Sequence, residues 1–243
     1  GHVLAGDTAA LAELRRMGVA RERLELAGRI EEAGIALPCN EAEHAAMVEL
    51  IAGRQIWLAH RVTAGEARAA VAAHGRLLSH AHRLLLILRP ARVEQGPELA
   101  ARLRAEGWGV GLRSAGEEPE AQMQIYVADS VGEDGLWFRL APVCFLGSSL
   151  AGGEGCTPYE AAALGSAILH GPGVAAHREA YARLARAGAA RQVRDEADLA
   201  AAVTELLSPD VAARMARAAW EVVSAGAEVT DRAMELILEA LES

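Results

Sequence analysis

The chain has 243 residues, which fits one large domain or one domain with a fragment of another. It is 52% hydrophobic and 4% aromatic, so apolar material for a core is ample and a disordered chain is disfavoured. The net charge of −9 makes it a poor non-specific binder of nucleic acid, because it would repel the phosphate backbone.

The three cysteines are far apart and form no CxxC pair, so neither a zinc site nor a disulfide framework is indicated. We expect no metal and no cofactor. A reducing, cytoplasmic compartment is the simplest interpretation. No stretch approaches the roughly 18 uncharged apolar residues of a membrane-spanning helix, and no signal peptide is visible. The chain begins with Gly1-His2 and has no initiator Met, so we expect an upstream part to be missing.

Short apolar runs alternate with amphipathic stretches along nearly the whole chain. Runs of this kind are typical of parallel strands buried on both faces, and we expect strands at residues 2–5, 55–60, 84–89, 109–113, 124–128, 143–146, 167–170 and 190–193. We expect helices at 7–17, 40–52, 64–79, 96–106, 133–140, 157–164, 176–187, 195–207 and 210–241, the last one broken near Ser208-Pro209 and near Gly226.

This repeated strand–helix order predicts an α/β fold with a doubly wound, Rossmann-like parallel sheet of about six strands. The strands at 84–88, 124–128 and 143–146 should be central. Residues 30–40, which include Gly34, Pro38 and Asn40, are typical of a linker. We therefore predict that residues 1–34 are the tail and linker of a preceding domain and that residues 35–243 form a complete one.

The most informative segment is a glycine-rich loop after the strand at 143–146. Thr157 and Glu160 have the spacing of a capping box, and Pro158 suits the first helical position. Free amides and the helix dipole favour an anion here, which at the carboxyl end of a parallel sheet would be a nucleotide phosphate. The alternative, at even odds from local chemistry, is a tight turn in which Glu160 only caps the helix.

A second segment, residues 128–141, again follows a strand and opens a helix. Ser130 is the expected N-cap, with Glu133 as its box partner. Trp137 and Leu140 fall on one face and are expected in the core. An acid pair of Glu133 and Asp134 is less favoured as catalytic than as first-turn acids that complement the helix dipole.

Three segments carry motifs of a known family. Residues 129–141 (DSVGEDGLWFRLA) resemble D-T-x-G-E-L-x-L-x-Y-R-x-A, residues 145–150 (FLGSSL) resemble F-x-G-G-S-L, and residues 157–165 (TPYEAAALG) resemble N-P-L-E-x-A-A-x-G. These are patterns of the bacterial Kdo (3-deoxy-D-manno-octulosonic acid) transferases. Residues 3–28 are similar to the end of that family's acceptor domain, so the resemblance covers nearly the whole chain.

The resemblance implies a GT-B glycosyltransferase, in which two Rossmann-like domains face a cleft and the C-terminal one binds the nucleotide sugar CMP-Kdo. It implies transfer of Kdo to a lipid A precursor in lipopolysaccharide core biosynthesis, a peripheral location at the inner membrane, and a catalytic base in the acceptor domain upstream. The donor residues that it implies are Pro90, Gly132, Glu133, Thr157, Pro158 and Glu160, and after them Arg92, Ser148 and Glu179.

Four further motifs of the family are altered in this sequence. P-R-H-P is PARV at 90–93, so Arg92 or Arg89 would have to substitute for the family's Arg. G-G-H-N is EGCT at 154–157, S-T-H is RVT at 61–63, and N-F-x-E keeps only Glu179.

Three hypotheses follow from the sequence. The first is an active transferase whose acceptor half lies outside this chain, and the second is a degenerate paralogue that binds a nucleotide or a partner protein. This chain has lost the Arg, His and Asn that a typical family member keeps, and these losses favour the second hypothesis. A dinucleotide oxidoreductase is disfavoured, because no early G-x-G-x-x-G follows the first strand of the domain. Fold alone does not choose among these.

Overall fold

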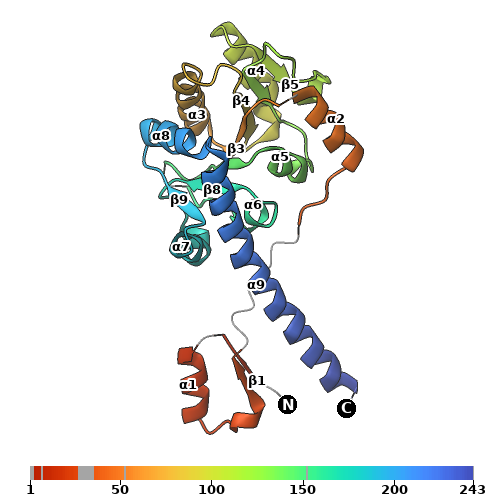
Figure 1. Ribbon diagram of the computed structural model, residues 1–243, viewed down its shortest axis with the longest axis vertical. Coiled ribbons are helices and arrows are strands. Elements are labelled where there is room, and N and C mark those ends of the chain that lie inside the picture. The colour runs from red at the N-terminus through yellow and green to blue at the C-terminus, as the bar shows by residue number, and fades with distance from the viewer. Residues whose placement is uncertain (1–2, 7, 27–35, 52, 152, 243) are drawn as a thin grey trace.

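The computed structural model describes residues 3–6, 8–26, 36–51, 53–151 and 153–242 (Figure 1). Seven parallel strands form its main sheet, in the order β5-β6-β4-β3-β7-β8-β9. Their bounds are β3 (Ile56–Val62), β4 (Leu85–Pro90), β5 (Val110–Leu112), β6 (Ile125–Val127), β7 (Val143–Leu146), β8 (Ala167–His170) and β9 (Ala190–Gln192).

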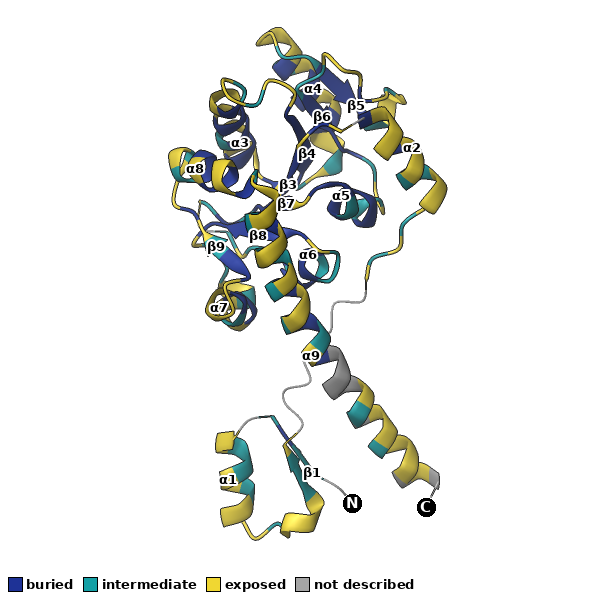
Figure 2. Ribbon diagram, in the orientation of Figure 1, coloured by how far each residue is buried: buried dark blue, intermediate teal, exposed yellow. Residues whose placement is uncertain are grey.

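Helices cover both faces of this sheet, which confirms the doubly wound prediction (Figures 1 and 2). One face carries α3 (Ala64–Leu77), α4 (Gly96–Ala105) and α8 (Glu196–Leu206), whose apolar side chains share a core with Trp57 and Leu86. The other face carries α2 (Glu41–Ile51), α5 (Asp134–Leu140), α6 (Tyr159–Ala163), α7 (Arg178–Arg186) and part of α9 (Pro209–Glu242). The central strands are buried on both sides, as parallel strands between two helical layers must be.

Two strand predictions need correction. The main sheet has seven strands rather than about six, and the strand at its centre is β3, with β4 and β7 beside it. β6 is not central, because β5 pairs along its outer side and leaves it next to the edge of the sheet. The local apolar runs of these strands resemble one another, so they did not predict the order of the strands in the sheet.

The helix predictions hold with one exception. The break near Ser208 is confirmed, since α8 ends at Leu206 and α9 begins at Pro209. The break near Gly226 is wrong, because α9 continues without interruption to Glu242. An isolated glycine costs only about 1 kcal/mol relative to alanine within a helix. Gly107 and Gly188 follow the ends of α4 and α7 and have positive φ angles of 93° and 69°, which glycine adopts readily after a helix.

The N-terminal residues form a separate small unit. β1 (Val3–Ala5) and β2 (Leu24–Leu26) pair in parallel around α1 (Thr8–Arg16), which buries none of its residues. Two contacts of 3.2 Å join Arg232 of α9 to Glu25 of this unit. The predicted linker at 30–40 lies largely outside the described residues. Among the described helices, none is both long and apolar enough to cross a membrane.

Candidate functional site

The chain reverses its winding direction between β3 and β7, which are neighbours in the sheet. From β3 the chain passes through α3 to β4 on one side, and from β7 it passes through α6 to β8 on the other. In open α/β sheets, ligands bind in the crevice that such a switch point opens at the carboxyl ends of the strands. The candidate site is therefore the edge where β3, β4 and β7 end.

The sequence-predicted residues lie along this carboxyl edge. Pro90 is the last residue of β4 and pairs with Val62 of β3. Gly132 has a φ angle of 81°, and Glu133 follows it immediately before α5. The others lie after β4, after β7, at the start of α6 and at the start of α7; they are Arg92, Ser148, Thr157, Pro158, Glu160 and Glu179.

Glu66 of α3 holds the beginning of the glycine loop. Its carboxylate accepts hydrogen bonds from the backbone amides of Ser148, Ser149 and Leu150 at 2.7, 2.7 and 2.8 Å. It also accepts from the amide of Thr63 at 2.8 Å, and the Thr63 hydroxyl accepts from the Glu66 amide in return. Glu66 is only 2% exposed. Burial would raise the pKa of this carboxyl, but the amide bonds outweigh burial and lower it.

These contacts revise the expected role of the loop. The three amides that follow β7 point at a carboxylate of the protein itself, so they are not available to a phosphate. The spacing of Thr63 and Glu66 is that of a capping box and could have identified the start of α3. No local signal could have shown that the same carboxylate binds a loop more than 80 residues later in the chain.

The two capping boxes predicted from the sequence are not formed. The N-cap of α6 is Pro158 and that of α5 is Glu133, and neither makes a side-chain capping bond. Thr157 Oγ1 instead accepts from the Tyr159 amide at 3.4 Å. The N-cap of α6 lies one residue after Thr157, and that of α5 lies three residues after Ser130, so each helix begins later than its predicted box would require.

Glu133 is engaged in a different interaction. Its two carboxylate oxygens accept hydrogen bonds from Nε and Nη2 of Arg113, at 3.0 and 2.6 Å. Arg113 also pairs with Glu43 of α2 at 2.7 Å, and its guanidinium lies 5.7 Å from the centre of the Trp137 ring. Trp137 is fully buried, as predicted, and so is most of Leu140. The Glu133 carboxylate thus anchors α5 within the fold.

Arg89 is also occupied, which removes it as a substitute for the family's Arg. Its guanidinium forms a two-bond ion pair with Asp134 and donates to the Pro90 carbonyl at 2.9 Å. His60 Nε2 lies 3.2 Å from the same Asp134 carboxylate, and burial lowers the pKa of this histidine. Burial opposes ionisation of Asp134, but His60 and Arg89 together lower its pKa to about 2.

Glu160 is half-buried at this edge, and its carboxylate has no ion-pair partner among the described residues. No other carboxylate of the predicted donor site combines these two properties. Burial raises its pKa, the charge of Asp134 adds to the rise, and the charge of Arg61 opposes it. Asp134, Arg61 and Glu160 are therefore close enough for their charges to interact. The site brings together the ends of β3 and β7 with the starts of α5 and α6.

The loop after β8 packs directly against the glycine loop. Gly171 donates from its amide to Ser149 Oγ at 2.8 Å, and the Gly173 amide donates to the Ser149 carbonyl at 2.6 Å. A Cβ atom at Gly171 would overlap the backbone of Ser149 and lie 2.5 Å from the Leu150 amide. Backbone cannot rotate away as a side chain can. We expect Gly171→Ala to lower the free energy of unfolding by about 2 kcal/mol, measured by denaturant titration. Gly116→Ala is the comparison, because Gly116 has a φ of 71° and open space around it, so that variant shows the cost of backbone strain without overlap.

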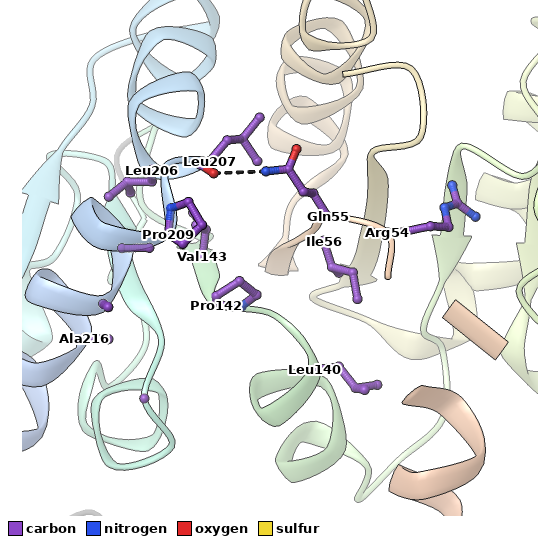
Figure 3. A pocket seen from close by; sticks show the side chains of 13 residues that line it. Arg54, Gln55, Ile56, Leu140, Pro142, Val143, Leu206, Leu207, Pro209 and Ala216 are labelled. Atoms are coloured by element: carbon purple, nitrogen blue, oxygen red, sulfur yellow. Dashed lines mark hydrogen bonds between the residues drawn. The ribbon is translucent and has the colours of Figure 1, made fainter. Parts of the chain in front are cut away.

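The carboxyl edge also contains hollows. A cavity of about 360 Å³ lies beside His170, Gly173 and Arg178, and one of about 330 Å³ lies beside Tyr159 and Glu179. A larger cavity of about 560 Å³ lies at the opposite, amino-terminal edge (Figure 3). Its polar groups have structural roles: Gln55 donates to the Leu207 carbonyl, and the Arg54 guanidinium points away and donates to backbone carbonyls.

Sequence comparison finds relatives of one kind. A 3-deoxy-D-manno-octulosonic acid transferase of Haemophilus influenzae is 29% identical over 191 residues, which are 78% of this chain and 45% of that protein. A probable mitochondrial 3-deoxy-D-manno-octulosonic acid transferase of Arabidopsis thaliana is 30% identical over 177 residues, or 71% of this chain and 40% of that protein. The chain thus spans less than half the length of these relatives. No family profile matches it.

Structure comparison agrees on the fold. The C-terminal CMP-Kdo binding domain of WaaA from Acinetobacter baumannii superimposes with a TM-score of 0.64 at 23% identity, covering 79% of this chain and 99% of that domain. HepE of Anabaena, solved with UDP and glucose, superimposes with a TM-score of 0.54 at 12% identity over the whole chain and 63% of HepE. The fold is that of the C-terminal domain of GT-B glycosyltransferases.

Proposed function

The chain belongs to the 3-deoxy-D-manno-octulosonic acid transferase family, and from this membership we propose that residues 35–243 are the donor-binding domain of a glycosyltransferase. The proposed donor is CMP-Kdo, and the proposed acceptor is a lipid A precursor bound by the remainder of the protein at the inner membrane. Residues 1–34 are then the end of the acceptor domain and the linker. Because the base that activates the acceptor hydroxyl would come from that domain, the chain alone should not transfer sugar.

The observation that supports this proposal is the switch point between β3 and β7. Glu160 and the Gly132 turn lie at the edge where the reversal opens a crevice, and a nucleotide is the ligand that such crevices take in doubly wound folds. The Glu160 carboxylate is suited to accept hydrogen bonds from the two hydroxyls of a ribose. Its pKa is raised, so CMP binding should weaken in acid, beginning above the pH at which an ordinary glutamate is protonated.

We expect CMP to bind this chain and Glu160→Gln to weaken that binding about 10- to 100-fold. The substitution keeps the shape but removes the charge that strengthens hydrogen bonds to the ribose. Since Glu160 makes no capping bond, stability should change by no more than about 0.5 kcal/mol. Calorimetric titration with CMP, UMP and ADP measures affinity, and denaturant titration measures stability.

Glu154→Gln is the matched control, because Glu154 is exposed in the same loop. It should bind CMP as the unmodified chain does. Equal CMP affinity in the Glu160 and Glu154 variants would remove the ribose role of Glu160. If neither this chain nor the full-length protein binds any of the three nucleotides at millimolar concentration, the donor-site proposal is wrong.

A second candidate is a degenerate paralogue that binds a nucleotide or a protein without transferring sugar. The engaged state of Glu133, of Arg89 and of the loop amides favours it, because each of these groups already has a partner within the protein. Turnover of CMP-Kdo by the full-length protein would exclude this alternative.

A further inference from the structure

Two residues with unusual backbone conformations meet at the switch point. Arg61 has a φ angle of 52° and Ser148 one of 55°, and they are the two non-glycine residues with positive φ among those that the structure describes. Residues with a Cβ atom rarely adopt this conformation, and where they do it is often at a functional site. Ser148 Oγ donates a hydrogen bond to the Arg61 carbonyl at 3.0 Å, so the two positions are in direct contact.

The surrounding structure holds Arg61 in this conformation. The pairing of β3 with β4 shifts register between Ala59 and Val62, which marks an irregularity in the strand. His60 packs against Phe138 of α5, with ring centres 4.7 Å apart, whereas Val62 joins the core on the opposite face of the sheet. Two residues of the same parity would share one face in a regular strand, so the chain turns at Arg61.

This turn leaves the Arg61 side chain exposed at the carboxyl edge. Among the described residues, none forms an ion pair with its guanidinium. Its charge nevertheless opposes the rise in the pKa of Glu160 and acts in the same direction on the pKa of Cys156, so the guanidinium is within electrostatic reach of the start of α6. Arg92 and Arg178 are exposed at the same edge, but neither acts on the pKa of Glu160.

Three other sets of groups near the switch point that could bind an anion are already in use. Arg89 pairs with Asp134, Arg113 pairs with Glu133, and Glu66 occupies the amides of the glycine loop. A nucleotide sugar with an acidic sugar carries two oxyanions, the phosphate and the carboxylate. A crevice for such a donor requires a positive charge to compensate them.

We propose that Arg61 supplies this charge and binds an oxyanion of the donor, the phosphate or the sugar carboxylate, at the junction of β3 and β7. The inference rests on the donor-site function proposed above and names the residue that recognises the anionic part of that ligand. The positive φ of Arg61 and the hydrogen bond from Ser148 to its carbonyl fix the backbone from which this exposed side chain leaves the carboxyl edge.

The test compares Arg61→Gly and Arg61→Lys with the unmodified chain. Glycine adopts positive φ without strain, so the first variant removes the guanidinium without forcing the backbone to move. Lysine keeps the charge. Arg217→Ala is the control, since it removes an arginine that is exposed on α9 and paired only with Glu221. Each protein is titrated with cytidine, with CMP, and with the free sugar acid in the presence of CMP.

If Arg61 binds the phosphate, Arg61→Gly should lose about 10- to 100-fold in affinity for CMP and none for cytidine, with partial recovery in Arg61→Lys. If it binds the carboxylate, only the affinity for the sugar acid should fall. Unchanged affinity for all three ligands in Arg61→Gly would overturn the assignment of Arg61 while leaving the donor site in place. Failure of both this chain and the full-length protein to bind CMP and cytidine would overturn the proposed function, and this inference with it.

Discussion

Replacing Glu66 with alanine is expected to lower the free energy of unfolding by about 3–5 kcal/mol. The carboxylate accepts four backbone hydrogen bonds, from Thr63 at the start of its own helix and from Ser148, Ser149 and Leu150. Alanine would leave these amides without a partner around a buried space, and unsatisfied buried donors are expensive. Glu66→Gln should cost less, because its single carbonyl oxygen still accepts some of these bonds. Guanidinium denaturation with both variants measures the effect.

Glu49→Ala serves as the matched control, because Glu49 is exposed on α2 and its loss should change stability by less than about 0.5 kcal/mol. The folded-state pKa of Glu66 is lowered, so its contribution is complete above the ordinary pKa of a glutamate and is lost as pH falls through the lowered value. The stability difference between the unmodified chain and Glu66→Ala should therefore shrink in acid. Equal stabilities at neutral pH would contradict this account of the loop.

Asp134→Leu is expected to cost about 3 kcal/mol or more, because it leaves the Arg89 guanidinium buried without its carboxylate. The side chain of Arg89 is 9% exposed and that of Asp134 is 23% exposed. Leucine is the residue that the Kdo transferase pattern has at the position of Asp134, so the site should accept its volume. The loss should come from the unpaired charge rather than from packing.

A double-mutant cycle with Arg89→Leu isolates that charge. The double variant should lose less stability than the two single variants added together, by about 1.5 kcal/mol or more, since replacing both partners of a buried pair by apolar residues is often nearly neutral. The pKa of Asp134 is lowered to about 2, so its contribution is present above roughly pH 4 and is lost as pH falls towards 2. Strictly additive losses would mean that the two groups do not stabilise each other.

The fold was predictable because its signals are local. Most of each strand from β3 to β8 is a short apolar run, and the amphipathic stretches between them repeat at the period of a helix. Burial of β4 between two helical layers follows from Leu85, Leu86, Ile87 and Leu88, which have no polar face to show to water. The pairing order was not predictable, because β5 and β6 are both short apolar strands. That β6 pairs with β4 and β5 lies at the edge depends on contacts across the sheet.

For the candidate site, too, the positions of the residues were predictable from the sequence but their interaction partners were not. Residues such as Pro90, Gly132 and Glu160 could be placed at one edge of the sheet from their positions after strands, since the carboxyl ends of parallel strands share an edge. Which of their groups are free for a ligand depends on partners distant in sequence. Glu133 forms an ion pair with Arg113, 20 residues away in the sequence, and Arg89 forms one with Asp134, 45 residues away.

By itself, the sequence determined the class of fold and the family to which the chain belongs, and it predicted the carboxyl edge as the location of the site. Short-range patterns of polarity and a few contiguous motifs carry all of these. Only the tertiary structure decided that Glu66 fills the loop amides and that Arg61 is turned out of β3 beside Ser148. Such features depend on where a carboxylate and a strand end meet after packing, and a backbone angle forced by neighbours leaves no trace in the local sequence.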